Sequence, residues 1–175
     1  MTLIAYANKT LYADDIHIIQ GTSEVEIVQR INKITISKCK RFAFGLAGPA
    51  PFPDELERIE LKARDTLIKY FTIKKANELI AAPCPRGEEP IILMARDVTF
   101  VSQGGTTLMK RLDERQPFGI GAGDDMFMFG YQLIEGPITQ AKIGKLFEDI
   151  SDINNLVGPL VTTVSVRQLK PFIFE

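Results

Sequence analysis

Two patterns of apolar residues alternate along the chain and divide it into predicted strands and predicted helices. Short apolar, β-prone runs bounded by polar, Gly or Pro residues indicate strands, whereas apolar positions three or four apart indicate amphipathic helices. The first two strands, 2–7 and 11–19, flank Asn8-Lys9-Thr10 and are predicted to form a hairpin. Further extended segments are predicted at 25–36, 42–47, 90–95, 97–103, 106–111, 117–121 and 161–166.

The helical period occurs in two separate pairs of segments. Pro53 starts the first helix, whose apolar positions recur as far as Phe71, and proline is well suited to the first turn. A second helix is predicted over about 74–82, before a Pro-rich loop. A third is predicted near 124–135, and a fourth follows Thr139, whose hydroxyl suits the cap position.

This order of strands, two helices, strands, two helices and a final strand indicates the α+β class rather than an alternating parallel sheet. Two antiparallel sheets packed face to face, with a pair of helices on each outer side, would bury all four helical stripes. We therefore predict a four-layer αββα sandwich. The sequence shows no internal linker or repeat, so residues 1–175 are expected to form a single domain.

Composition narrows the class of protein further. The 175 residues carry 21 Lys and Arg against 22 Asp and Glu, and this net charge of -1 argues against a nucleic-acid partner. No apolar run approaches the roughly 18 residues that span a bilayer, and no targeting segment is recognisable, so no membrane partner is expected. Cys39 and Cys84 are isolated thiols, which favours a reducing, cytoplasmic location.

The candidate chemistry lies in the first fifteen residues. If Met1 is removed, Thr2 offers a hydroxyl and a free α-amine in one residue. A threonine hydroxyl is a poor nucleophile unless a base takes its proton. The α-amine can serve as that base, because its unperturbed pKa is about 7.7–8. The alternative is that Thr2 is an ordinary residue near the N-terminus with no catalytic role.

Two other constellations are weaker. Asp14-Asp15-Ile16-His17 holds oxygen and nitrogen ligands, but alternate strand residues face opposite sides and His17 is the only histidine. Gly119-Ile120-Gly121-Ala122-Gly123 precedes a helix as a nucleotide loop would, yet Asp124 and Asp125 would repel a phosphate. Close backbone packing explains these glycines better. We therefore expect no metal and no cofactor.

Several fragments, taken in order, resemble the proteasome β-subunit and HslV family of N-terminal nucleophile hydrolases. The opening Thr2-Leu3-Ile4-Ala5-Tyr6 resembles the strand that begins those mature subunits with threonine. Tyr12-Ala13-Asp14-Asp15 resembles the family's Ala-Ala-Asp-Ser segment, and Asn32-Lys33-Ile34 the strand that carries its lysine. Gly45-Leu46-Ala47-Gly48 resembles Gly-x-Ala-Gly-Gly, and 119–123 the later glycine segment. The resemblance covers almost the whole chain.

The resemblance implies the αββα fold, threonine peptidase activity and a catalytic group. Thr2 would be the nucleophile. Lys33 would lower the pKa of the α-amine because two positive charges repel each other. Asp14 would hold Lys33 and compensate its burial. The backbone N–H of Gly48 would face the developing oxyanion.

Other positions are implied less directly or depart from the family pattern. Gly45 falls where family members line the pocket for the residue before the cleaved bond. Because Gly45 has no side chain, we expect a roomy pocket that accepts large apolar residues. Ala122 stands where many members carry a supporting serine. Pro49 replaces a glycine and removes one backbone N–H. Asp152 and Asn155 match a supporting aspartate and its partner.

The resemblance also implies a polypeptide substrate, assembly into a homo-oligomeric ring and an ATP-dependent unfoldase as partner. A second hypothesis is a noncatalytic protein that retains Met1 and keeps this fold as a structural or assembly unit, which Ala122 and Pro49 favour. A third is a hydrolase of the same nucleophile class that cleaves a small amide. The first and second differ in whether Met1 precedes Thr2.

Overall fold

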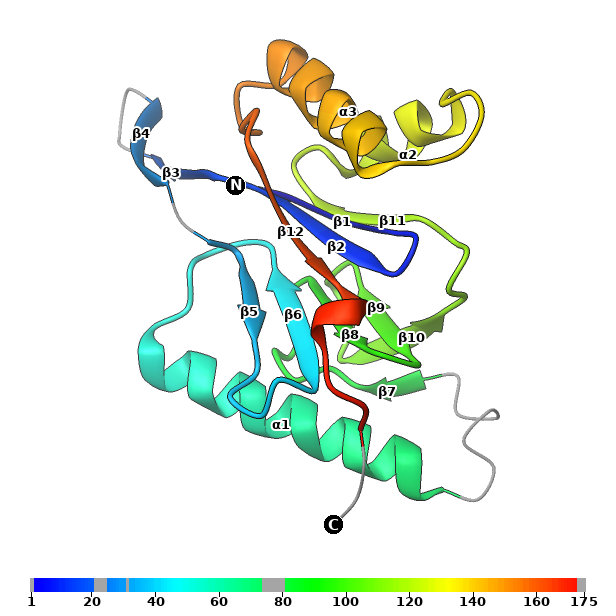
Figure 1. Ribbon diagram of the computed structural model, residues 1–175. Coiled ribbons are helices and arrows are strands. Elements are labelled where there is room, and N and C mark those ends of the chain that lie inside the picture. Colours follow the sequence, from blue (N-terminus) through cyan, green and yellow to red (C-terminus); the bar gives the residue numbers. More distant parts are fainter. Residues whose placement is uncertain (1, 21–24, 31, 74–80, 173–175) are drawn as a thin grey trace.

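The computed structural model places two antiparallel sheets face to face with helices on both outer sides, as predicted (Figure 1). It describes residues 2–20, 25–30, 32–73 and 81–172. The helices are α1 (Pro53–Thr72), α2 (Asp124–Gln132) and α3 (Gln140–Ile153). In the described part of the chain, none of them is long and apolar enough to cross a bilayer.

The first sheet has four strands, in the order β11, β1, β2, β12. Their bounds are Phe118–Gly121 for β11, Leu3–Ala7 for β1, Thr10–Asp14 for β2 and Val161–Ser165 for β12. Because β1 lies in the middle of this sheet, its residues alternate between two cores. Leu3, Ala5 and Ala7 pack against α2 and α3, whereas Ile4 and Tyr6 face the second sheet.

The second sheet has six strands, in the order β5, β6, β8, β9, β10, β7. Their bounds are Ile34–Ile36, Phe42–Leu46, Ile91–Ala95, Thr99–Ser102, Leu108–Leu112 and Ala81–Pro83, respectively. Alternation on β6 sends Phe42, Phe44 and Leu46 toward α1. Ala43 enters the core between the sheets. A separate pair of strands, β3 (Ile16–Gln20) and β4 (Val25–Arg30), extends from the sandwich (Figure 1).

One sequence prediction of local structure was wrong, and a second was wrong in the part that the structure describes. The strand predicted over 11–19 is two strands, since β2 ends at Asp14 and β3 pairs with β4 instead of continuing the hairpin. The buried carboxylate of Asp14 accepts hydrogen bonds at this point, and the chain leaves the sheet after it. The helix predicted over 74–82 falls mostly on 74–80, outside the described residues, and Ala81–Pro83 are a strand paired with β10.

The helical layers follow the predicted stripes. Thr139 caps α3 by accepting a hydrogen bond from the Lys142 N–H at 3.3 Å. Ile143, Phe147 and Ile150 of α3 are buried against the first sheet. The helix predicted near 124–135 ends earlier, with Leu133 as its C-cap. Among the described residues, α1 alone covers the second sheet, whereas α2 and α3 together cover the first.

Candidate active site

The carboxylate of Asp14 is the centre of a buried polar cluster at one end of the sandwich. Its Oδ1 accepts a hydrogen bond from the Thr2 hydroxyl at 2.5 Å and one from the Leu3 N–H at 3.0 Å. The Lys33 ammonium donates to the same oxygen at 2.7 Å. Oδ2 accepts from the Gly158 N–H at 2.9 Å. The carboxylate is therefore bound by four donors, and its side chain has no solvent exposure.

These donors come from three separate parts of the fold. Thr2 and Leu3 lead into β1, which pairs with β2, so that Leu3 starts its strand near Asp14 at the end of β2. Gly158 precedes β12, which pairs with the other edge of β2. Lys33 precedes β5 of the second sheet, and β5 lies against β2 and β12. The cluster is thus complete only when both sheets are in place.

Lys33 is oriented by its own neighbours. The Asn32 side chain accepts a hydrogen bond from the Ile34 N–H at 3.1 Å, which fixes the turn into β5. The Lys33 side chain is 5% exposed. Burial lowers the pKa of its ammonium, while the adjacent Asp14 carboxylate acts in the opposite direction. The net lowering means that desolvation outweighs the ion pair.

The direction of this shift predicts a pH dependence of stability. With a folded pKa below the unfolded one, the native state binds fewer protons between these two values, so stability rises with pH there. The penalty for burying the ammonium is full below the folded pKa. It is relieved as the pH rises toward 10.5, the ordinary pKa of a lysine side chain. We expect the free energy of unfolding of the wild type, minus that of Lys33→Met, to increase with pH in this alkaline window. Denaturant titrations at several pH values measure it, and a flat or falling difference would contradict the lowered pKa.

Thr2 is held at both ends. Besides its hydroxyl bond to Asp14, its carbonyl oxygen accepts from the Ala122 N–H at 2.7 Å. Gly121, beside it, has a φ of 98°, a region that favours glycine. A Cβ on Gly121 would lie 1.9 Å from the Thr2 oxygen. The glycine segment 119–123 therefore serves the close backbone packing that the sequence suggested. Thr2 itself is buried.

The structure also places residues 47–49, the segment predicted to carry the oxyanion donor Gly48 and called here the oxyanion segment, beside this group. A Cβ built on Gly121 would lie 3.4 Å from the Cβ of Ala47, and the same position adjoins the Thr2 carbonyl oxygen. Ala47 therefore lies next to Thr2, and Gly48 follows it in the chain. Gly48 is exposed and has a φ of 95°. Pro49 follows it and offers no N–H, so the Gly48 amide stands without a neighbouring donor at position 49.

The remaining sequence candidates lie elsewhere or act differently. Gly45 faces the inter-sheet core, where a Cβ would come within 2.7 Å of Ile4 Cγ2, so Ile4 fills the space expected to be a roomy pocket. That prediction needs correction: the glycine serves packing. Asp152 and Asn155 are exposed, whereas Thr2 is buried. Instead, Asn154 donates from Nδ2 to the Ala122 carbonyl at 2.9 Å.

Sequence reasoning missed three contributors to this region. Gly158 acts through its backbone, for which no residue-type signal exists. Asn154 follows the last turn of α3, and a better boundary for that helix would have favoured it over Asn155. Arg86 donates from Nη1 to the Ala47 carbonyl at 2.6 Å and from Nη2 to the Pro49 carbonyl. Its partners are backbone oxygens 37 and 39 residues away, so spacing could not reveal them.

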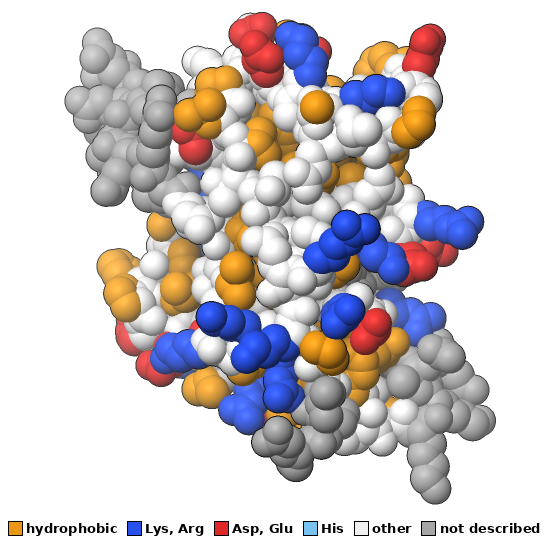
Figure 2. All heavy atoms as spheres, viewed as in Figure 1, with side chains coloured by type: hydrophobic (Ala, Val, Ile, Leu, Met, Phe, Trp, Pro, Cys, Tyr) orange, Lys and Arg blue, Asp and Glu red, His pale blue; other side chains and the backbone are white. Residues whose placement is uncertain are grey.

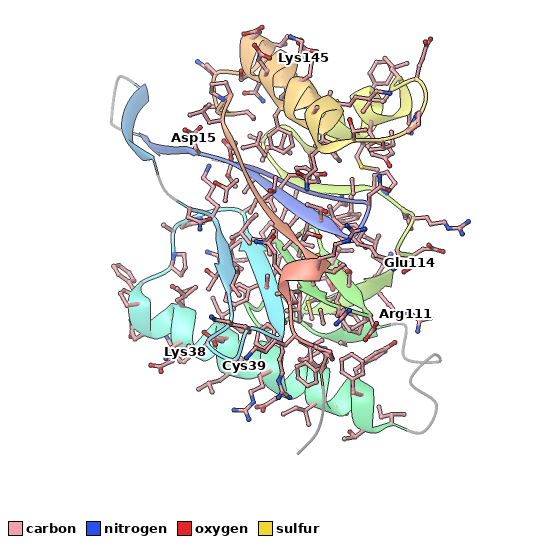
Figure 3. The ribbon with its side chains drawn as sticks, viewed as in Figure 1. Asp15, Lys38, Cys39, Arg111, Glu114 and Lys145 are labelled. Carbon is pink, nitrogen blue, oxygen red and sulfur yellow. The ribbon has the colours of Figure 1, made fainter. Side chains whose placement is uncertain are left out.

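The opposite end of the first sheet is chemically different. Glu114 and Arg111 lie there, well away from Asp15, which follows Asp14 (Figure 3). A cavity of about 520 Å³ at this end is lined by Tyr6, Arg111, Glu114 and neighbours, and by none of Thr2, Asp14 and Lys33. Across the described residues, no group of three or more His, Cys, Asp or Glu side chains is placed to hold a metal ion.

Comparison with known proteins identifies the architecture. No family model and no curated protein matches the sequence. Among solved structures, eukaryotic HslV from Trypanosoma brucei aligns over 93% of this chain and 97% of its own, with a TM-score of 0.62 and 12% identity. The chain has the HslV fold. BPH of Thiobacillus denitrificans aligns over 93% of this chain and 95% of its own, with a TM-score of 0.57 and 11% identity. A structure of BPH in complex with epoxomicin gives a TM-score of 0.55.

Proposed function

We propose that this chain is a threonine-type peptidase with Thr2 as its nucleophile once Met1 has been removed. One observation carries the proposal: the Thr2 hydroxyl and the Lys33 ammonium contact the same oxygen of a fully buried Asp14 carboxylate. Met1 lies outside the described residues. The HslV fold supports this proposal, because the sequence fragments that suggested the activity resemble segments of proteins with that fold.

Each group then has a chemical role. The free α-amine of Thr2 takes the proton of the hydroxyl as the oxygen attacks a peptide carbonyl. The neighbouring Lys33 ammonium favours the neutral amine, because a second positive charge nearby is costly. Asp14 compensates the Lys33 charge and fixes the Thr2 hydroxyl. The Gly48 N–H donates to the oxyanion that develops on the attacked carbonyl.

The experiment combines intact mass with turnover of a fluorogenic peptide panel. We expect the mature N-terminus at Thr2 and measurable cleavage. We also expect a stable adduct with epoxomicin, the compound that BPH binds. Retained Met1 with neither turnover nor adduct would refute the proposal.

We further propose a homo-oligomeric ring that encloses the site, with an ATP-dependent unfoldase delivering polypeptide in the cytoplasm. Exposed apolar side chains support an assembly surface. On α2 and just beyond it, Met126, Phe129 and Leu133 lie at helical spacing on one face and are 40%, 67% and 64% exposed. Figure 2 shows apolar side chains at the surface over this end of the molecule, among charged ones.

Assembly is tested by light scattering. The wild type is expected to exceed the 19.6 kDa of one chain several-fold. Phe129→Asp should shift the mass toward that of one chain, because a charge would then be buried in the contact. Leu61→Asp is the matched control: Leu61 is also exposed, but it lies on α1 across the sandwich. A wild type of 19.6 kDa, or an unchanged mass in Phe129→Asp, would count against this surface.

A noncatalytic role is the second candidate, and one observation favours it. Thr2 is buried, and its hydroxyl donates to a carboxylate. In such a protein, Met1 would remain and Thr2 would serve packing. Epoxomicin separates the two candidates, because we expect an adduct only from the processed protein with Thr2 at its N-terminus.

A further inference from the structure

Arg86 bridges the two sides of the oxyanion segment. Its guanidinium donates to the carbonyl of Ala47 at 2.6 Å and to that of Pro49. These carbonyls flank Gly48, so the two bonds fix the chain direction before and after the Gly48 N–H. An arginine suits this task because its planar guanidinium presents several donors in a rigid fork. A proline at position 49 cannot anchor the segment through its own N–H.

The loop that carries Arg86 is itself held in place. At one end, the Cys84 N–H donates to the Thr107 carbonyl at 2.7 Å, and the Gly87 N–H closes a turn on Cys84 at 3.2 Å. At the other end, the Glu88 carbonyl accepts from Gly105 at 2.8 Å. Arg86 therefore projects from a turn tied to the β9–β10 connection, and the oxyanion segment is linked to the rigid six-stranded sheet.

The charge of Arg86 is used for this bridge and not for an ion pair. The guanidinium makes no ion pair with a carboxylate of the described residues, although its Nη1 lies 3.9 Å from the Cβ position of Gly48. Glu89 Oε2 lies 2.9 Å from the same position, yet the two side chains form no salt bridge. A partly buried arginine loses hydration, and the two bonds to backbone carbonyls offset part of that cost while they hold the carbonyls in place.

We infer that Arg86 is a positioning residue for the oxyanion site, holding the Ala47–Pro49 segment so that the Gly48 N–H faces the carbonyl attacked by Thr2. This inference rests on the proposed peptidase function. Arg86 touches no reacting atom in this scheme. It acts through the backbone of the segment, and it replaces by side-chain bonds the anchoring that Pro49 cannot supply.

The test uses the full-length, processed protein with Arg86→Met and Arg86→Lys. Removing an oxyanion donor outright typically lowers kcat by about 100- to 1,000-fold. Loosening the donor should cost less, and we expect Arg86→Met to lower kcat by about 10- to 100-fold with KM changed less than about threefold. Arg86→Lys keeps the charge but loses the fork, so it should recover only a small part of kcat. Arg96→Met, an exposed arginine at the far cavity, should match the wild type.

A second measurement separates this inference from the proposed function. Hydrogen exchange of the peptide covering residues 45–52 should be faster in Arg86→Met than in the wild type and unchanged in Arg96→Met. This holds whether or not the protein cleaves peptides. An inactive wild type would refute the peptidase proposal alone. Unchanged exchange in Arg86→Met, full activity in Arg86→Lys, or a loss expressed only in KM would each overturn the positioning role.

Discussion

Thr2→Ala in the processed protein is expected to lower peptide turnover by about 1,000-fold or more, because the nucleophilic atom is removed from a group that acts as a unit. Alanine, like threonine, is small enough to permit Met1 removal, so the α-amine remains while the hydroxyl and the γ-methyl group are lost. The substitution also removes the 2.5 Å bond to Asp14. The fold should survive, with a loss of about 1–2 kcal/mol from one buried hydrogen bond.

The measurement is turnover of the best fluorogenic peptide, with intact mass recorded for every sample. Thr2→Ser is the matched variant, since it keeps both the hydroxyl and the amine and should retain part of the activity and the epoxomicin adduct. Equal activity in Thr2→Ala and the wild type would show that another residue cleaves the peptide, and the proposed function would fail.

Asp14→Asn is expected to reduce the free energy of unfolding by about 3–5 kcal/mol, the usual cost of breaking a buried ion pair from one side. Lys33 would keep a buried charge without its partner. The asparagine NH₂ only donates, so either the Gly158 N–H or the donors on the other side would lose their acceptor. Peptide turnover should fall with stability, because both Thr2 and Lys33 lose the atom that orients them. Denaturant unfolding monitored by circular dichroism provides the measurement.

Two comparisons keep the Asp14 prediction specific. Asp149→Asn breaks an exposed pair with Lys145, 2.8 Å long on α3 (Figure 3), and should cost less than about 1 kcal/mol. The double variant Asp14→Asn with Lys33→Met removes both buried charges and should be more stable than Asp14→Asn alone. A loss below about 1 kcal/mol in Asp14→Asn, or no gain in the double variant, would contradict the buried pair.

The fold class could be predicted from the sequence because the spacing of apolar residues clearly separates strands from helices. Apolar alternation and helical stripes predicted the αββα layers, and the Thr139 cap was correct. The continuity of 11–19 was wrong because β propensity continues past Asp14, whereas the side chain of Asp14 ends the pairing by binding four donors. Residues 81–82 were assigned to a helix because the pairing of Ala81–Pro83 with β10 is a long-range contact that local propensity does not contain.

The sequence predicted only those site residues whose own side chains have recognisable chemistry. Thr2, Asp14 and Lys33 are types with obvious chemistry, and the structure brings them together. Gly45 was misread because the sequence cannot show that Ile4 from another sheet fills the space beside it. Arg86 and Gly158 act on or through backbone groups, so their roles depend on geometry that no local pattern encodes.

The four-donor environment of Asp14 has an evolutionary consequence. Because the carboxylate ties three separate segments together, selection for a stable sandwich preserves it even when selection for cleavage has ended. Under the proposed function, a descendant that lost peptidase activity would be expected to keep Asp14 and Lys33 as structural residues and to change first at Thr2, Gly48 and Arg86. These three positions would therefore distinguish active from inactive relatives. The Asp14–Lys33 pair would indicate only that the fold is kept.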